Sequence, residues 1–373
     1  MRLYPIPGLI LAAVMLLTGV SATQAQEADP PDTPSTAVAE FSDPQPLSLP
    51  RSVRLEGLRP VYQQINRCSA AALTIQLSYF EWDGTYDEVI RALNPHAEDM
   101  AVRLDEMITY AETQGLRAVA RYGGTNDMLK RLVAAGFPVL VENSYFDSGD
   151  HWRDWMGHNR VVMGYDDDLE VFYTFDSLLG NGEDGRGRPI PYADMDSRWR
   201  VFNRDYLVLY RPDEEAAVQA ALGSQWDETY NHEWALSLSQ QEVDEGRADG
   251  FTYFNLGSSL LELERPDEAV AAYDQALSMQ LPWRMLWYQY GPFEAYLHAE
   301  RYDEVISLAA GVIGATGGIE ESYYYMGLAY EAQNDLRRAE SMLRAATIRN
   351  GFFTPAAEAL ERVRAAMETT TGG

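Results

Sequence analysis

The sequence is poor in two residue types on which common catalytic mechanisms depend. Its 373 residues contain one cysteine, Cys68, and one lysine, Lys130. A single cysteine cannot form a disulfide within its own chain, and a single lysine gives little support to Schiff-base or Ser-Lys chemistry. The chain also has no Gly-rich loop ending in Gly-Lys-Ser/Thr, so nothing in it indicates nucleotide hydrolysis.

Positive charge is also scarce. The formal net charge is -28 at pH 7 and the sequence pI is about 4.4. A surface this negative repels phosphate backbones and anionic lipid heads. We therefore expect no nucleic-acid partner.

The first residues have the pattern of an export signal. Arg2 precedes an apolar run, residues 8–22, that is too short for a comfortable membrane span. Residues 1–25 are predicted to be a signal peptide cut after Ala22 or Ala25, which implies a periplasmic or secreted protein; an uncleaved anchor is the alternative. Residues 26–52 are rich in Pro and acid and predict a disordered tether. No membrane span is expected after signal cleavage.

Residues 53–212 mix helical and strand patterns. Amphipathic or apolar segments predict helices, and runs rich in Val, Tyr and Phe between Asp and Gly turns predict strands. The expected helices are 68–80, 85–93, 103–116 and 125–136; the expected strands are 117–122, 137–143, 159–165, 171–176 and 205–210. Helices followed by strands predict an α+β domain with an antiparallel sheet.

From residue 213 to 366 the strands stop and an internal repeat begins. Gly257, Ala269 and Ala276 recur as Gly327, Ala339 and Ala346, an offset of 70 residues or two repeats of 35. Small residues at this period resemble tetratricopeptide repeats, which predicts an all-α domain whose concave face binds a peptide or protein partner. A purely structural role for the repeats is equally compatible with the pattern. Residues 367–373 are expected to be a flexible tail.

Cys68 stands where a turn gives way to an apolar helix. Free N–H groups and the helix dipole at that position stabilise a thiolate, and Arg67 is a neighbouring cation. The alternative is a small buried apolar residue, the common fate of a free cysteine. An unpaired thiol in an exported chain nevertheless indicates a candidate nucleophile.

A nucleophilic thiol needs a base and a group that orients the base. His158 and Asp176 flank a hairpin whose turn is expected near Asp167 and Asp168. That register places His158 opposite or nearly opposite Asp176, at about one cross-strand spacing of roughly 5 Å. A turn histidine and a strand-ending Asp are the alternatives.

The same chemistry needs donors for a developing oxyanion. The backbone N–H of Cys68 is one candidate. The side chain of Gln63 is the other, with Gln64 as its rival.

Three segments carry a resemblance to a known family: Q-Q-I-N-R-C at 63–68, GHNRVVMGYDD at 157–167 and VFYTFDS at 171–177. They resemble the papain-like, double-glycine-leader type of cysteine peptidase, family thirty-nine, and in particular its exported relatives with tetratricopeptide repeats. The resemblance implies Cys68 as nucleophile, His158 as general base and acid, Asp176 as its orienter and Gln63 as oxyanion donor. Peptide substrates are implied, and no cofactor or metal.

The chain departs from that family in two ways. Cys68 is followed by Ser69 and Ala70 where the family commonly has Gly-Pro, and no transporter or ATPase segment is present. The expected function is an exported thiol peptidase. The alternatives are a catalytically silent binding module and a thiol amidase or acyl transferase.

Two further features were considered. Asp150, His151, Asp154 and His158 cluster in the sequence, but their spacing fits no known zinc pattern. The Gly-rich residues 181–188 predict a mobile flap beside the proposed site.

Overall fold

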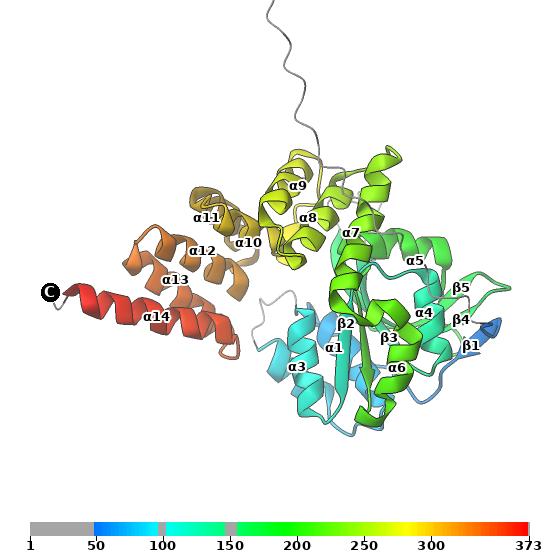
Figure 1. Ribbon diagram of the computed structural model, residues 1–373. Coiled ribbons are helices and arrows are strands. Elements are labelled where there is room, and N and C mark those ends of the chain that lie inside the picture. The colour runs from blue at the N-terminus through cyan, green and yellow to red at the C-terminus, as the bar shows by residue number, and fades with distance from the viewer. Residues whose placement is uncertain (1–47, 96–101, 146–154, 372–373) are drawn as a thin grey trace, which may run out of the picture. The chain divides into compact units, whose positions relative to one another are not determined.

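The computed structural model describes residues 48–95, 102–145 and 155–371 (Figure 1). The predicted signal peptide lies outside the described residues, as do most of the predicted tether, His96 and His151. Ser52, the last residue of the predicted tether, begins the first strand.

An antiparallel sheet organises residues 52–210 and confirms the predicted α+β class. Among the described residues it has seven strands, in the order β2-β7-β3-β4-β5-β6, and β1 pairs with β4 beyond the end of β3. The strands are β1 (Ser52–Arg54), β2 (Arg117–Arg121), β3 (Val139–Tyr145), β4 (Met156–Asp166), β5 (Val171–Asp176), β6 (Arg188–Pro191) and β7 (Tyr206–Tyr210).

Helices cover both faces of this sheet. They are α1 (Cys68–Ser78), α2 (Tyr86–Leu93), α3 (Leu104–Thr113), α4 (Asn126–Ala134), α5 (Tyr192–Trp199) and α6 (Glu215–Leu222). Side chains alternate between faces along a strand. In β3, Leu140 joins the core beneath α1, α2 and α3, whereas Val139 and Val141 join the core beneath α4, α5 and α6.

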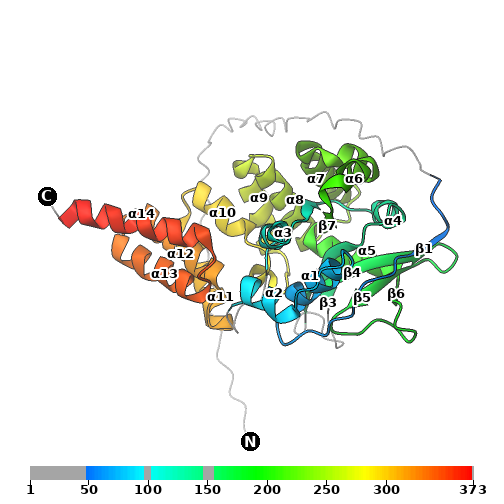
Figure 2. The same ribbon diagram turned by 90° about the horizontal axis from the view of Figure 1, so that it is seen from below.

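Helix α1 is the central helix of the first core. Every one of its residues is buried, as expected for a helix that is apolar nearly all round. It lies against β4, with β3 and β5 alongside (Figure 2). The amide nitrogen of its polar Gln76 donates to the carbonyls of Pro138 and Leu207, each at 2.9 Å. The helix is thereby fixed in depth against the sheet, and its first residue, Cys68, is fixed with it.

After α6, the described residues form helices joined by turns and loops. The helices are α7 (Glu228–Asp244), α8 (Gly250–Glu262), α9 (Pro266–Ser278), α10 (Gly291–His298), α11 (Tyr302–Thr316), α12 (Glu320–Ala332), α13 (Leu336–Arg349) and α14 (Thr354–Thr371). Helix α14 continues through most of the residues that the sequence assigned to a tail. None of the helices in the described part of the chain combines the length and apolar character needed to cross a bilayer.

Small residues allow the repeat helices to approach closely. A Cβ on Gly257 in α8 would lie 2.8 Å from the Tyr273 ring of α9, and a Cβ on Gly327 in α12 would lie 2.7 Å from Leu343 of α13. These two pairs are two repeats apart in the sequence, and Ala269 and Ala339 are fully buried in the same helix pairs. The small residues therefore mark helix crossings, as the sequence predicted.

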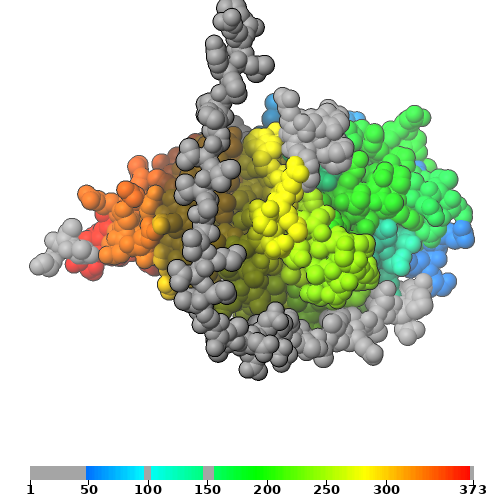
Figure 3. All heavy atoms as spheres, turned by 90° about the horizontal axis from the view of Figure 1, so that it is seen from above, coloured from blue at the N-terminus to red at the C-terminus, as the bar shows by residue number. Residues whose placement is uncertain are grey.

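The α/β region and the helical region share a core. One apolar cluster contains Trp155, Val201 and Phe202 together with side chains of α8 to α12. The ring of Trp155 stacks on that of Phe202, with 5.7 Å between the ring centroids. In the space-filling view, green and yellow-green residues of the two regions meet along one surface (Figure 3).

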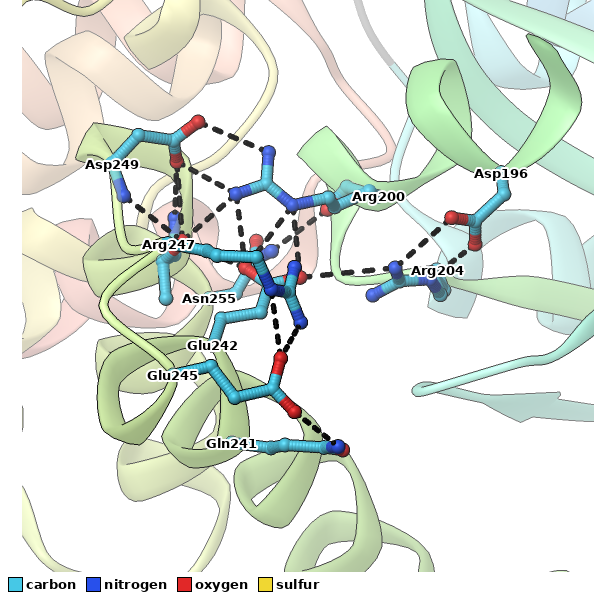
Figure 4. A network of polar contacts seen from close by, with 10 residues as sticks. Asp196, Arg200, Arg204, Gln241, Glu242, Glu245, Arg247, Asp249 and Asn255 are labelled. Atoms are coloured by element: carbon cyan, nitrogen blue, oxygen red, sulfur yellow. Dashed lines mark hydrogen bonds and ion pairs between the residues drawn. The ribbon is translucent and has the colours of Figure 1, made fainter. Parts of the chain in front are cut away.

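An ionic network reinforces this junction (Figure 4). Arg200, in a 3-10 turn (Arg200–Phe202) that follows α5, pairs with Glu242 of α7 at 2.9 Å and with Asp249 at 2.8 Å. Thr252 also bonds to Arg200 and Glu242. Because these groups are hydrogen-bonded as well as charged, they tie the first repeat helices to the end of the sheet region.

Candidate active site

Cys68 occupies the first position of α1. Asn66 adopts a left-handed backbone, with φ of 58°, which Asn tolerates better than most residues and which turns the chain into the helix. Arg67 is the N-cap and makes no side-chain capping bond. The first N–H groups of the helix, that of Cys68 included, have no intrahelical acceptor. The thiol, 8% exposed, therefore lies at an electropositive helix end.

His158 and Asp176 meet across the β4–β5 hairpin. His158 Nε2 lies 3.0 Å from Asp176 Oδ1, and both side chains are 1% exposed. The pairing differs from the predicted one, because Arg160 rather than His158 stands opposite Asp176. The turn is centred later than expected, and the register shifts between Val162 and Gly164. His158 reaches Asp176 diagonally, two residues along the strand.

The imidazole links the carboxylate to the thiol. His158 hydrogen-bonds the Cys68 side chain, and because Asp176 occupies Nε2, Nδ1 is the ring nitrogen left for sulfur. Burial raises the pKa of the Cys68 thiol, but the hydrogen bond and charge of His158 outweigh burial and bring that pKa down to about 7. Burial lowers the pKa of His158, but bonds to Asp176 and Cys68 raise it above its ordinary value. The arrangement favours a thiolate–imidazolium pair.

Asp176 is held as a carboxylate from several sides. Burial disfavours its charge, but His158 and Arg160 hold its pKa well below the usual range. Arg160 donates to Oδ2 at 2.6 Å, and the backbone N–H groups of Leu178 and Leu179 donate to Oδ1 at 2.8 Å. Arg160 was missed by sequence reasoning. Its spacing of two from His158, which puts both on one face of a strand, was the available signal.

Ser69 packs beside the thiol. The Asn159 amide donates to Ser69 Oγ at 3.1 Å and lies 3.9 Å from Cys68 Sγ. The hydroxyl therefore occupies space where the resembling family commonly has a glycine, and it gives Asn159 an acceptor.

Gln63 and Gln64 differ in their surroundings. The Gln63 backbone donates to the Ser177 carbonyl at 3.0 Å, and Ser177 Oγ donates to Gln63 Oε1 at 2.8 Å. Ser177 follows Asp176, so Gln63 is anchored at the site with its amide nitrogen left as a donor. Gln64 is exposed, and its backbone N–H donates to the Tyr86 hydroxyl at 3.2 Å. Gln63, unlike Gln64, is thus tied to the residue after Asp176, and its role as oxyanion donor stays a prediction.

Other groups near the thiol were not found from the sequence. Burial raises the pKa of Tyr288, and the charge of Cys68 raises it further; the Gly157 N–H bonds to the Tyr288 hydroxyl. Glu142 of β3 also has its pKa raised by burial, by Asp205 and by Cys68. Tyr288 belongs to the segment between the first two repeats, so no local pattern links it to Cys68.

The structure describes only part of the Asp and His cluster at residues 150–158, and it describes all of the Gly-rich residues 181–188. Asp150, His151 and Asp154 lie outside the described residues, and within the part described no three His, Cys, Asp or Glu side chains gather as metal ligands. Residues 181–188 connect β5 to β6 and lie beside the site, since Asn181 Oδ1 accepts from the Asp176 N–H at 3.3 Å. The mobility of this segment stays a prediction.

Comparisons with known proteins match two separate parts of the chain. The Peptidase_C39 like family matches residues 58–206, and a tetratricopeptide repeat matches residues 252–281. No curated protein matches the sequence.

Several solved structures are similar to parts of the chain. A double glycine motif protease from an AMS/PCAT transporter, in complex with its leader peptide, has 18% identity, covers 43% of this chain and 94% of its own, and gives a TM-score of 0.31. A putative C39-like peptidase from Bacillus anthracis has 14% identity, with 43% and 98% coverage and a TM-score of 0.34. YrrB, a TPR protein with an unusual peptide-binding site, has 18% identity, with 40% and 76% coverage and a TM-score of 0.33. By their family models, residues 58–206 are similar to the C39-like peptidases, and the chain joins this region to a segment that matches a tetratricopeptide repeat.

Proposed function

We propose that this protein is an exported cysteine peptidase in which Cys68, His158 and Asp176 act together. The observation that carries the proposal is the continuous contact from thiol to imidazole to carboxylate, supplied by a helix start and two strands. The pKa of about 7 for Cys68 gives an appreciable thiolate population at neutral pH.

The first half-reaction forms an acyl-enzyme. The Cys68 thiolate attacks the carbonyl carbon of a peptide bond, and a C–S bond forms. The Cys68 backbone N–H and the Gln63 amide donate to the oxygen that becomes negative. Imidazolium His158 then gives its proton to the leaving nitrogen, and the C–N bond breaks.

The second half-reaction restores the enzyme. Neutral His158 takes a proton from water, and the resulting hydroxide attacks the thioester carbon. The C–S bond breaks, the acid product leaves, and the thiolate–imidazolium pair is regenerated. Asp176 does not exchange protons; it orients the ring and stabilises its cationic form.

The test is peptide hydrolysis by the wild type and by Cys68→Ala. We expect the variant to lose hydrolysis and labelling by iodoacetamide, with little change in melting temperature. Peptide cleavage that survives in this variant at the wild-type rate would end the proposal.

A silent binding module is the competing function. The low exposure of Cys68, at 8%, and the Ser69 side chain beside it both favour restricted access. In that case the helical repeats would hold a protein partner, and purified protein would bind that partner without thiol-dependent turnover. An acyl transferase differs by its product, because an added amine would then appear in an amide instead of the free acid.

Export is proposed from the sequence of residues 1–25. N-terminal sequencing of the protein recovered outside the cytoplasm should begin at Thr23 or Gln26. An intact Met1 in that fraction would contradict signal cleavage.

A further inference from the structure

A cavity of about 640 Å³ lies between the edge strand β2 and helices α7, α8 and α10. Its lining is rich in carboxyl groups. These belong to Asp105, Glu142, Asp205, Glu228, Glu262 and Glu294.

One end of this cavity reaches β4, the strand that carries His158. Glu142 and Tyr288 line the cavity, and the charge of Cys68 acts on both. A Cβ on Gly157, the residue before His158, would lie 2.7 Å from Glu142 Oε1 and 3.0 Å from the Tyr288 ring. Glu142 and Tyr288 therefore pack against the strand residue that precedes His158.

The two guanidinium groups that line the cavity already have partners. Arg103 pairs with Asp105 at 2.9 Å and also with Glu321. Arg121 donates to the carbonyls of Ala120 and Gln225, each at 2.7 Å. Among the described residues, neither Glu142 nor Asp205 forms an ion pair with a basic side chain. The cavity therefore holds uncompensated carboxyl groups.

Burial shifts the pKa values of these carboxyl groups. Asp205 is 6% exposed and accepts the Glu142 backbone N–H at 3.2 Å. Burial raises the pKa of Asp205, and burial together with the Asp205 charge raises that of Glu142. A cation placed between these two carboxyl groups would favour their ionised forms and lower both pKa values.

A second buried group is also incompletely satisfied. His232 lines the cavity, is 6% exposed, and its Nδ1 has no hydrogen-bond partner. Burial lowers its pKa, so the ring is neutral at pH 7 and does not compensate the carboxyls. An organic cation suits this lining, since no three side chains in the described ranges converge as metal ligands.

We propose that this cavity binds the ammonium or guanidinium group of a basic side chain in the peptide substrate, next to the bond that is cleaved. The proposal rests on the peptidase function and names its substrate class. An ammonium group supplies three hydrogen-bond donors and a positive charge to Glu142, Asp205 and their neighbours.

The experiment uses two chloroacetamide probes that alkylate Cys68. One carries a primary ammonium on a short tail, and its twin carries the same amine acetylated. Labelling rates are measured by intact mass on the full chain, so the readout does not require turnover. We expect the wild type to react about tenfold faster with the ammonium probe.

Asp205→Asn tests the cavity, because Asn keeps the acceptor for the Glu142 N–H and removes the charge. We expect it to lose the preference while reacting with the acetylated probe at the wild-type rate. Glu361→Gln, an exposed site in α14, makes the same change in net charge and should keep the preference. If Asp205→Asn fails to fold, Glu262→Gln at the exposed side of the cavity replaces it.

Equal rates for the two probes in the wild type would overturn the cation site, as would equal effects of Asp205→Asn and Glu361→Gln. Peptide hydrolysis is scored separately. A charge preference without cleavage of any peptide would refute the peptidase and leave the cation site standing. Cleavage of lysine and acetyl-lysine peptides at equal rates would support the peptidase function and refute the cation site.

Discussion

At the scale of single residues, His158 is the group that links Asp176 to Cys68. One ring nitrogen faces Asp176 and the other is left for Cys68. The carboxylate stabilises the protonated imidazole, and the protonated imidazole stabilises the Cys68 thiolate. Arg160 shares the same carboxylate and fixes its position. The thiol pKa therefore depends on a residue that does not touch it, which makes Asp176 a positioning residue.

Replacing Asp176 should weaken this transmission. Asp176→Asn removes the charge that stabilises imidazolium, so the pKa of His158 should fall and that of Cys68 should rise. The midpoint of Cys68 alkylation against pH should move to higher pH. The exposed Asp168→Asn, on the turn of the same hairpin, is the control and should leave the midpoint unchanged. A midpoint in Asp176→Asn equal to that of the wild type would show that the carboxylate has no such role.

The glutamine pair gives a second prediction at this scale. Gln63→Ala should lower kcat by about 100- to 1,000-fold, because an oxyanion donor is removed. Gln64→Ala, one residue along and exposed, should stay near the wild-type value. Alkylation of Cys68 should be equal in both variants, since no oxyanion forms in that reaction. The reverse ranking of the two variants would assign the role to Gln64.

At the scale of elements, the strong patterns were predictable and the weak ones were not. The helix at Cys68 and strands β3, β4, β5 and β7 follow from apolar runs and turn residues. Strand β6 was missed because Pro189 and Pro191 argue against a strand, although the edge of a sheet tolerates Pro. Strand β1 and helix α5 were also missed. Strand β1 is only three residues long, and α5 begins directly after Pro191.

The candidate site shows the same limit. His158 and Asp176 could be paired because one hairpin relates them locally, whereas Cys68 was joined to them by the needs of thiol chemistry and by the family resemblance. Glu142, Asp205 and Tyr288 depend on the pairing of distant strands and on where the repeats pack. No periodicity in a single sequence encodes those contacts.

The helix crossing at Gly257 gives a prediction about stability. Gly257→Ala would press a Cβ to 2.8 Å from Tyr273, so overpacking should destabilise the fold by about 1–3 kcal/mol. Gly311→Ala in α11 meets no atom within 4 Å and should instead stabilise by about 0.5–1 kcal/mol. Urea unfolding of the two variants measures both changes. Equal shifts would mean that the crossing is not tight.

At the scale of the whole molecule, the junction between the sheet and the repeats matters for function. Tyr288 and the part of the cavity lining that comes from α7, α8 and α10 belong to the helical region. The proposed cation site is therefore formed by both regions.

The Arg200 network tests how strongly the regions are joined. Arg200→Met leaves the carboxylate of Glu242 with its main partner removed and should destabilise the protein by about 3–5 kcal/mol. Arg247→Met, which breaks the exposed pair with Glu245, should cost less than about 1 kcal/mol. A small effect of Arg200→Met in thermal unfolding would show that the apolar contacts suffice.

The same network predicts an acid dependence. Burial raises the pKa of Glu242, but its bonds to Arg200 and Thr252 hold it below the ordinary value. A depressed carboxyl pKa stabilises the fold above the ordinary value of about 4.3 and loses that contribution as pH falls further. The stability difference between wild type and Arg200→Met should therefore shrink below about pH 4. A constant difference across that range would contradict the assignment.

The most direct test of the central claim is the rate of Cys68 alkylation by iodoacetamide as a function of pH, in the wild type and in His158→Ala. We predict a wild-type midpoint near the thiol pKa of about 7. In His158→Ala the midpoint should move to about 8.5 or above, the range of an unassisted or buried thiol. Identical midpoints in the two proteins, or a wild-type thiol that does not react at any pH, would contradict the account.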